Sequence, residues 1–200
     1  MEARTARSEL TRAAIVGAAL DLAAAEGLES ITLQAVADRI GLSKSGVFSR
    51  VGSRETLQKA VVEEFGRRFI EDVFVPSMQQ PKGLPRLEAI VQRWIVRTRD
   101  LEARTGCIYS AGAFELDDRQ GPLRDQLHGE VVRWRAALRR TVLQAVEAGH
   151  LRPDTDAEQL VAELSALVLG LVHDTRFLRD GRAAERAQAS WQRLLASYRA

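Results

Sequence analysis

The sequence predicts an all-α protein of about nine helices, built as a small N-terminal three-helix domain and a larger C-terminal helical body. Apolar side chains recur every three or four residues along the chain, which is the spacing of one face of a helix. Glycine and proline separate these runs, as turns between helices require. Leu, Ala, Arg and Glu dominate the composition, and these residues favour helices.

Four helices are expected in the first third of the chain. The first spans about residues 8–27, the second 32–41 and the third 43–51, and the fourth begins near residue 53. Thr or Ser stands at the start of the last three as an N-cap, and glycine ends the first three. The apolar faces of the first, second and fourth are Ile15, Ala18, Ala19 and Leu22; Leu33, Val36, Ala37 and Ile40; and Leu57, Val61, Phe65 and Phe69.

Five more helices are expected after a connection rich in proline and glycine. They cover about residues 87–98, 108–116, 122–149, 158–179 and 182–198. Pro122 suits the first turn of the long third member, because its missing N–H would have no partner there. Asp156 and Gln159 resemble a capping box before the fourth member.

Composition limits the class of protein. The net charge is only +2, so an argument for nucleic-acid binding depends on where the charges lie. The single cysteine, Cys107, forms no internal disulfide, and no residue pattern indicates a metal or another cofactor. The charged N-terminus is no signal peptide, and the longest apolar stretch is shorter than the roughly 20 residues that cross a bilayer. We therefore expect a cytoplasmic protein with no membrane partner.

The second and third helices form the pattern of a helix-turn-helix motif, since both are short and a glycine-containing turn joins them. The third begins with small polar residues, which leave its N-terminal N–H groups open to a phosphate. Between Arg39 and Lys59, five basic side chains stand against the one acidic side chain of Glu55. Similar helix pairs occur in bundles that bind no DNA, but the order, caps and charge together predict DNA binding.

Residues 32–48 and 52–57 resemble the helix-turn-helix and the fourth-helix entry of the TetR/AcrR family of transcriptional regulators. The stretch 106–122 resembles one C-terminal subgroup of that family. The resemblance implies a homodimer that reads a palindromic operator in double-stranded DNA with one recognition helix per subunit. It also implies an unknown small-molecule effector, which in the family's usual mode releases the DNA.

Eight residues are implied as DNA contacts by their match to family positions. Thr32 and Arg54 match positions that usually touch phosphate. Phe48 replaces a usual tyrosine, whose hydroxyl contact is therefore lost, and Arg50 is expected to restore it. The expected DNA-binding residues are Thr32, Ser43, Lys44, Ser45, Gly46, Phe48, Arg50 and Arg54. Val47 is expected in the core.

The helical body carries aromatic residues that would suit a pocket for a small apolar or amphipathic ligand. The candidates are Trp94, Tyr109, Phe114, Trp134, His173 and Phe177. An ordinary core position is the alternative for each. Glu115 lies in an apolar segment and needs a partner if buried, for which Arg97, Arg133 and a cationic ligand are the options.

The helix at residues 158–179 is apolar on two stripes, so it needs cover on both sides. With the final helix it fits a four-helix bundle across a two-fold axis. The expected interface residues are Leu160, Leu164, Leu167, Leu171, Trp191 and Leu195. The alternative is a helical hairpin buried within one subunit.

These expectations combine into a ligand-responsive repressor with a DNA-binding domain at 1–53 and a ligand-binding and dimerisation domain at 54–200. The fourth helix links the two. An enzyme is not expected, since the sequence has no Gly-rich phosphate loop, nucleophile elbow or metal-ligand spacing. The rival reading is a helical protein-interaction module without sequence-specific DNA binding.

Overall fold

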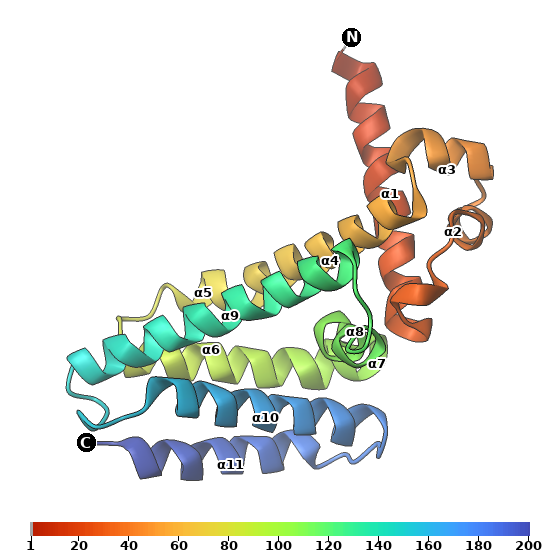
Figure 1. The fold of residues 1–200 in the computed structure, drawn as a ribbon. Coiled ribbons are helices and arrows are strands. Elements are labelled where there is room, and N and C mark those ends of the chain that lie inside the picture. Colours follow the sequence, from red (N-terminus) through yellow and green to blue (C-terminus); the bar gives the residue numbers. More distant parts are fainter. Residues whose placement is uncertain (1) are drawn as a thin grey trace. The chain divides into compact units, whose positions relative to one another are not determined.

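The computed structural model describes residues 2–200, with side chains from Ser8 onward. These residues form nine continuous helices and no β-strand beyond one isolated bridge, which confirms the predicted all-α class (Figure 1). The helical segments are α1 (Glu2–Glu26), α2 (Leu33–Ile40), α3 (Lys44–Val51), α4 (Arg54–Phe69), α5 (Val75–Ser77), α6 (Leu84–Arg97), α7 (Ala103–Thr105), α8 (Ile108–Glu115), α9 (Pro122–Glu147), α10 (Ala157–Arg176) and α11 (Ala183–Tyr198). The π-helical turns Ile70–Phe74 and Thr98–Glu102 join α4 to α5 and α6 to α7.

Packing divides the chain into two units. Unit 1 comprises Met1–Arg67 and Cys107–Gly129, and unit 2 comprises Arg68–Gly106 and Glu130–Ala200. Unit 1 therefore holds the predicted helix-turn-helix together with α8, a segment that follows it by more than fifty residues. The division of function at residue 53 stays a prediction.

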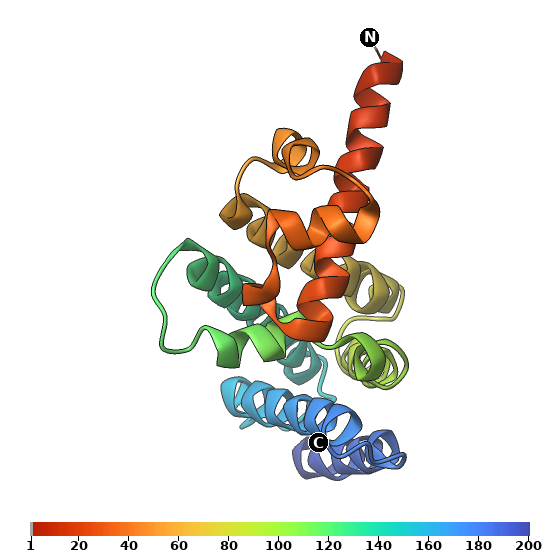
Figure 2. The same cartoon turned by 90° about the vertical axis from the view of Figure 1, so that its right-hand side faces the viewer.

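The caps that the sequence indicates hold the short helices of unit 1. The Thr32 hydroxyl accepts a hydrogen bond from the Ala35 N–H at 3.0 Å, and the Ser43 hydroxyl accepts one from Gly46 at 3.0 Å. Gly41 ends α2 in the left-handed conformation at φ +67°, which a side chain would strain. Figure 2 shows α2 and α3 against α1, and their buried residues are Val36, Ala37, Val47 and Val51.

Helix α1 starts at Glu2, six residues before the expected position. The reason is local, because residues 2–7 contain neither glycine nor proline and five of them are Glu, Ala or Arg, which favour helices. A short 3-10 turn, Leu28–Ser30, follows α1 and leads to α2. Leu28 and Ile31 bury their side chains almost completely, so this connection is part of the core of unit 1.

Helices α10 and α11 lie side by side and antiparallel in unit 2, as Figures 1 and 2 both show. The Asp156 carboxylate caps α10 by accepting hydrogen bonds from the N–H groups of Glu158 and Gln159, at 2.9 and 3.0 Å. Tyr198 donates a hydrogen bond to Glu163 at 2.8 Å and so ties α11 back to α10. Burial, and then this hydrogen bond, raise the pKa of the Tyr198 phenol. None of the described helices has the length and hydropathy needed to cross a bilayer.

A buried ion pair lies at the second π-helical turn. Arg97 Nε donates to Glu102 Oε1 at 3.1 Å, and both side chains are at least 95% buried. Thr98 donates its hydroxyl proton to the other Glu102 oxygen at 3.1 Å, and Arg97 also pairs with the half-exposed Asp72. The extra residue in a π-helical turn changes the phase of the helix, and here it brings Arg97 and Glu102 together on the buried side.

Truncation of this carboxylate is expected to destabilise the protein. Glu102→Ala removes the buried carboxylate that pairs with Arg97 Nε, so the free energy of unfolding should fall by about 3 kcal/mol. The measurement is urea unfolding followed by circular dichroism. Asp100→Asn is the matched control, because Asp100 pairs with Arg99 in solvent, where an ion pair contributes little to stability. Equal unfolding free energies for the two variants would contradict this account.

Candidate nucleic-acid interface and ligand site

The outer face of α3 brings six of the eight expected DNA-binding residues together. Val47 and Val51 point into unit 1, as expected for Val47, and they fix which face of α3 is outward. The outward residues are Ser43, Lys44, Ser45, Phe48, Ser49 and Arg50, with Gly46 half-buried beside them. Phe48 is 58% exposed, which is unusual for a phenylalanine on a helix that has a core to face.

Hydroxyl groups at the start of α3 are already ordered by the chain itself. Ser43 accepts the N–H of Gly46, and its oxygen lies 3.1 Å from the Ser45 hydroxyl. Ser49 donates to the Gly46 carbonyl at 2.9 Å. A hydroxyl has one donor and two acceptor sites, so each serine keeps capacity for a further partner at the surface.

Three basic side chains near α3 carry no internal counter-charge. Among the described side chains, Arg39, Lys44 and Arg50 form no ion pair. Lys59 is different, because it pairs with Glu55 at 2.7 Å. The positive charge predicted for residues 39–59 is therefore concentrated on the helix-turn-helix itself.

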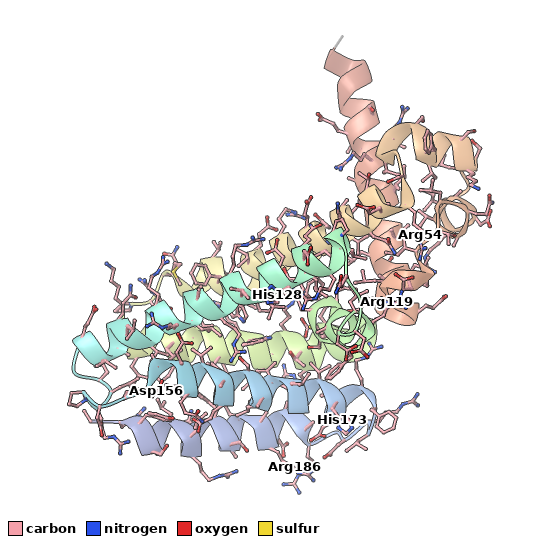
Figure 3. The ribbon with its side chains drawn as sticks, in the orientation of Figure 1. Arg54, Arg119, His128, Asp156, His173 and Arg186 are labelled. Carbon is pink, nitrogen blue, oxygen red and sulfur yellow. The ribbon has the colours of Figure 1, made fainter. Side chains whose placement is uncertain are left out.

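The side chain of Arg54 makes hydrogen bonds within the protein that the sequence does not indicate. Its Nε donates to the Ile31 carbonyl at 2.8 Å, and one Nη donates to the Glu29 carbonyl at 2.7 Å (Figure 3). The same nitrogen lies 3.3 Å from the Glu29 carboxylate. Arg54 therefore braces the connection between α1 and α2, while its predicted phosphate contact stays a prediction.

Glu115 binds backbone amides, which corrects the expectation of a partner among Arg97, Arg133 or a cationic ligand. One carboxylate oxygen accepts the Leu28 N–H at 2.8 Å and the other accepts the Glu29 N–H at 2.7 Å. Sequence reasoning missed this because backbone groups leave no residue-type signal and lie more than eighty positions away. It also missed Gln58, whose buried amide donates to the Leu28 carbonyl at 2.8 Å.

Two of the expected pocket residues meet in an aromatic cluster of unit 2. The ring centroids of Trp94 and Trp134 are 5.3 Å apart, and Phe69 lies edge-on to both at 5.7 and 4.8 Å. Phe74 adds a fourth ring 6.2 Å from Trp134. The Arg97 guanidinium stands 5.6 Å from the Phe69 ring centre, within range of a cation–π contact.

The cluster contains a hydrogen-bond donor, the indole N–H of Trp134, that lacks an acceptor among the described residues. Trp134 is 93% buried, and its Nε1–H has no hydrogen-bond partner among the described residues. A buried donor without a partner loses its hydration without compensation, at a cost of about 1–3 kcal/mol. Buried polar groups without a partner are few in folded proteins, so this indole N–H is an exception within the cluster.

Each of the other four pocket candidates has surroundings of its own. Tyr109 packs edge-on against Phe65 in unit 1, with ring centroids 4.9 Å apart. Phe114 and Phe177 are 66% and 77% exposed. His173, labelled in Figure 3, is also exposed; it contacts the Asp174 carboxylate and tilts against the Phe177 ring. Sequence periodicity does not separate these positions, because it reports a helix face and not what that face meets.

Five of the six expected dimer residues form the core of unit 2. The side chains buried inside this unit are Leu160, Leu164, Leu171, Trp191 and Leu195. Leu167 alone of the six remains partly exposed, in a shallow groove of about 490 Å³ between α10 and α11. Small residues, including Ala166, Gly170 and Ser190, line this groove. The surface that α10 leaves free beside this groove thus carries Ala166, Leu167 and Gly170.

A helix-turn-helix with an exposed basic second helix, carried on an all-α body, is the architecture of a helical DNA-binding regulator. The family model for the tetracyclin repressor-like C-terminal domain matches residues 83–191, which is more than half of the chain. The chain therefore belongs to the TetR family of transcriptional regulators.

Solved structures agree over nearly the whole chain. A TetR-family regulator of Cytophaga hutchinsonii shares 19% identity with a TM-score of 0.82 over 96% of both chains. A TetR regulator of Chloroflexus aurantiacus shares 24% identity with a TM-score of 0.80, over 95% of this chain and 94% of that one. AibR, solved with isovaleryl coenzyme A and operator DNA, shares 21% with a TM-score of 0.73, over 90% and 95%. Comparison with curated proteins gives no match.

Proposed function

We propose that the protein is a homodimeric repressor that binds a palindromic operator through α3 and is released by a small-molecule effector. The observation that carries this proposal is the outer face of α3, where unpaired basic side chains, small hydroxyl residues and an exposed phenylalanine lie together. Phosphates would pair with Arg39, Lys44 and Arg50, and the narrow helix N-terminus would enter the major groove. A regulator of similar fold, AibR, was solved with both operator DNA and a ligand, which supports this pairing of functions.

Individual contacts follow from where each side chain stands. Lys44, Ser45 and Gly46 are proposed at base edges, because they occupy the first turn of α3, the part of a recognition helix that enters the groove. Thr32 and Ser43 use their oxygens as helix caps, so their hydroxyl protons are the groups left for phosphate. Arg50 is proposed at a phosphate. Arg54 contacts phosphate only through the guanidinium edge that the turn at residues 29–31 leaves free.

The effector site is proposed at the aromatic cluster of unit 2. A ligand with a flat apolar part would meet the rings of Trp94 and Trp134, and an oxygen acceptor on it would satisfy the free indole N–H. Phe114, His173 and Phe177 are weaker candidates because their side chains are exposed, and Tyr109 is a weaker candidate because it packs against Phe65 in unit 1. The effector acts on DNA binding only through its different affinity for the two conformations.

The alternative function is a helical module that binds another protein without sequence-specific DNA affinity. It would use the same exposed surface of α3. The unpaired cations favour DNA, since a protein partner would need a matching set of acids, whereas every duplex offers regularly spaced phosphates.

Sequence selection from random duplex DNA with the purified full chain tests the proposal. We expect an enriched palindrome, and Lys44→Ala should weaken binding to it by about ten-fold at the lower of two salt concentrations. Lys82→Ala is the matched control, because Lys82 is an exposed lysine of unit 2. Binding without sequence enrichment would leave only a basic surface, and a complete lack of binding that persists after the protein is refolded free of small molecules would favour the protein-interaction module.

The exposed ring of Phe48 is expected to contact a thymine methyl group, since it cannot make the hydrogen bond of a tyrosine. Replacing single thymines of the selected site by deoxyuridine removes only that methyl group. One such replacement should weaken binding about three- to four-fold, the effect of one buried methyl group. Phe48→Ala should be insensitive to the same replacement. A selected site without thymine, or an equal response of both proteins at every position, would contradict this contact.

The groove between α10 and α11 is expected to be part of the dimer interface. An added Cβ at Gly170 meets nothing within 4 Å in the subunit, so Gly170→Glu should fold normally but place a charge in the interface. We expect a monomer in sedimentation velocity and weak binding to the palindrome. Gly181→Glu, equally open within the subunit, is the control and should stay dimeric. A dimer for both variants would place the interface elsewhere.

A further inference from the structure

Helix α8 lies within the region matched by the C-terminal domain of the family, yet it packs in the unit of the helix-turn-helix. Its contact with the Leu28–Ser30 turn is close. A Cβ added at Gly112 would lie 2.9 Å from the side chains of both Leu28 and Leu127, so a larger residue there would have to displace these leucines. The absence of a side chain at Gly112 lets the Leu28 side chain pack closely against α8.

The carboxylate of Glu115, at the end of α8, completes this contact. It accepts the Leu28 and Glu29 N–H groups at 2.8 and 2.7 Å, one on each oxygen. N–H groups at the start of a helical turn have no partner inside it, so Glu115 supplies what the local chain lacks. A charged acceptor makes these bonds stronger than bonds between neutral groups.

Gly27 shows how closely the carboxylate is seated. Its φ of +91° is a conformation that side chains rarely adopt, and an added Cβ would lie 3.0 Å from a Glu115 oxygen. Arg119, shown in Figure 3, adds an ion pair to the Glu29 carboxylate at 3.2 Å. Residues 112–119 thus contact the turn in three ways: by packing, by two hydrogen bonds from backbone N–H groups to the Glu115 carboxylate, and by one ion pair. We call this set of contacts the Glu115 clamp.

The opposite side of the turn is held by α4, the helix that follows the recognition helix. Gln58 donates to the Leu28 carbonyl, and Arg54 donates to the Glu29 and Ile31 carbonyls. The N–H groups of Leu28 and Glu29 are therefore bound by α8, and the carbonyls of the same two residues are bound by α4. Since α2 begins two residues after Ile31, the position of the turn sets the start of the helix-turn-helix.

We propose that Glu115 is a positioning residue for DNA binding, which holds the Leu28–Ser30 turn so that α2 and α3 take the orientation that fits the operator. A shift of α8 would be passed to the helix-turn-helix through this carboxylate. The inference rests on the proposed function, because it assigns a route by which the effector-binding body controls that same DNA-binding surface.

Glu115→Gln is the test variant, because it keeps the shape of the side chain but offers one acceptor oxygen and turns an N–H group toward the second amide. Amide hydrogen exchange of Leu28 and Glu29 should become roughly ten-fold faster or more, since hydrogen bonds to charged groups are the stronger ones. Binding to the selected palindrome should weaken by roughly five-fold or more. Asp118→Asn removes a carboxylate from the exposed loop after α8 and should change neither quantity.

Two further variants distinguish a role of Glu115 in positioning from a role in stability alone. All proteins are compared under conditions in which each is fully folded. Ile15→Val weakens the core of unit 1 without touching the clamp, so it should bind the palindrome normally. Glu115→Asp keeps the charge with a shorter reach and should lie between wild type and Glu115→Gln in both measurements; it also serves if Glu115→Gln does not fold.

Each outcome decides the proposal. Unchanged exchange at Leu28 and Glu29 would overturn the clamp, and faster exchange with unchanged DNA affinity would overturn its role in positioning. Equal weakening by Ile15→Val would reduce Glu115 to a stabilising residue. If wild type itself selects no DNA sequence, the proposed function fails and takes the positioning role with it, whereas the exchange data still report on the two hydrogen bonds.

Discussion

The turn at Leu28–Ser30 needs hydrogen-bond partners from distant parts of the chain, and the organisation of unit 1 depends on how it obtains them. Its N–H groups bind Glu115 from α8, and its carbonyls bind Arg54 and Gln58 from α4. An uncapped turn buried with Leu28 would leave polar backbone groups without partners, which is costly. The helices of the helix-turn-helix are thus anchored by a segment that the sequence analysis placed in the other domain.

The outer face of α3 is exposed because the contacts that hold this helix in unit 1 use other groups. Cap bonds occupy the oxygens of Thr32 and Ser43, while the valines of α3 face inward. What remains outward is a set of cations without internal counter-charges and the ring of Phe48. In the proposed complex, these hydrated cations would pair with phosphates and the exposed Phe48 ring would contact a methyl group in the groove.

In unit 2, by contrast with the exposed cations of α3, the polar groups beside the aromatic cluster are buried. Arg97 and Glu102 neutralise each other beside the aromatic cluster, so the guanidinium can lie against Phe69 without a net buried charge. The indole N–H of Trp134 has no comparable partner. The cluster thus lies beside a satisfied ion pair and contains a buried donor without a partner among the described residues, which is why the effector site is proposed there.

Much of the fold was determined by local sequence, because helix faces and caps depend on residues a few positions apart. The apolar spacing predicted the helices, and Thr32, Ser43 and Asp156 predicted three caps that the structure contains. The resemblance of residues 32–57 to the family identified the helix-turn-helix, whose outward residues lie together as expected.

The tertiary structure alone decided which faces meet. Periodicity marks an apolar stripe but not its partner, so Leu164 was expected at a dimer interface and instead lies in the core of unit 2. The same limit applies to Phe114 and Phe177, which are exposed. For Glu115, charge predicted the need for a partner, but the partners are backbone amides that look alike at every residue. Only the folded chain, which brings α8 to the turn after α1, could select them.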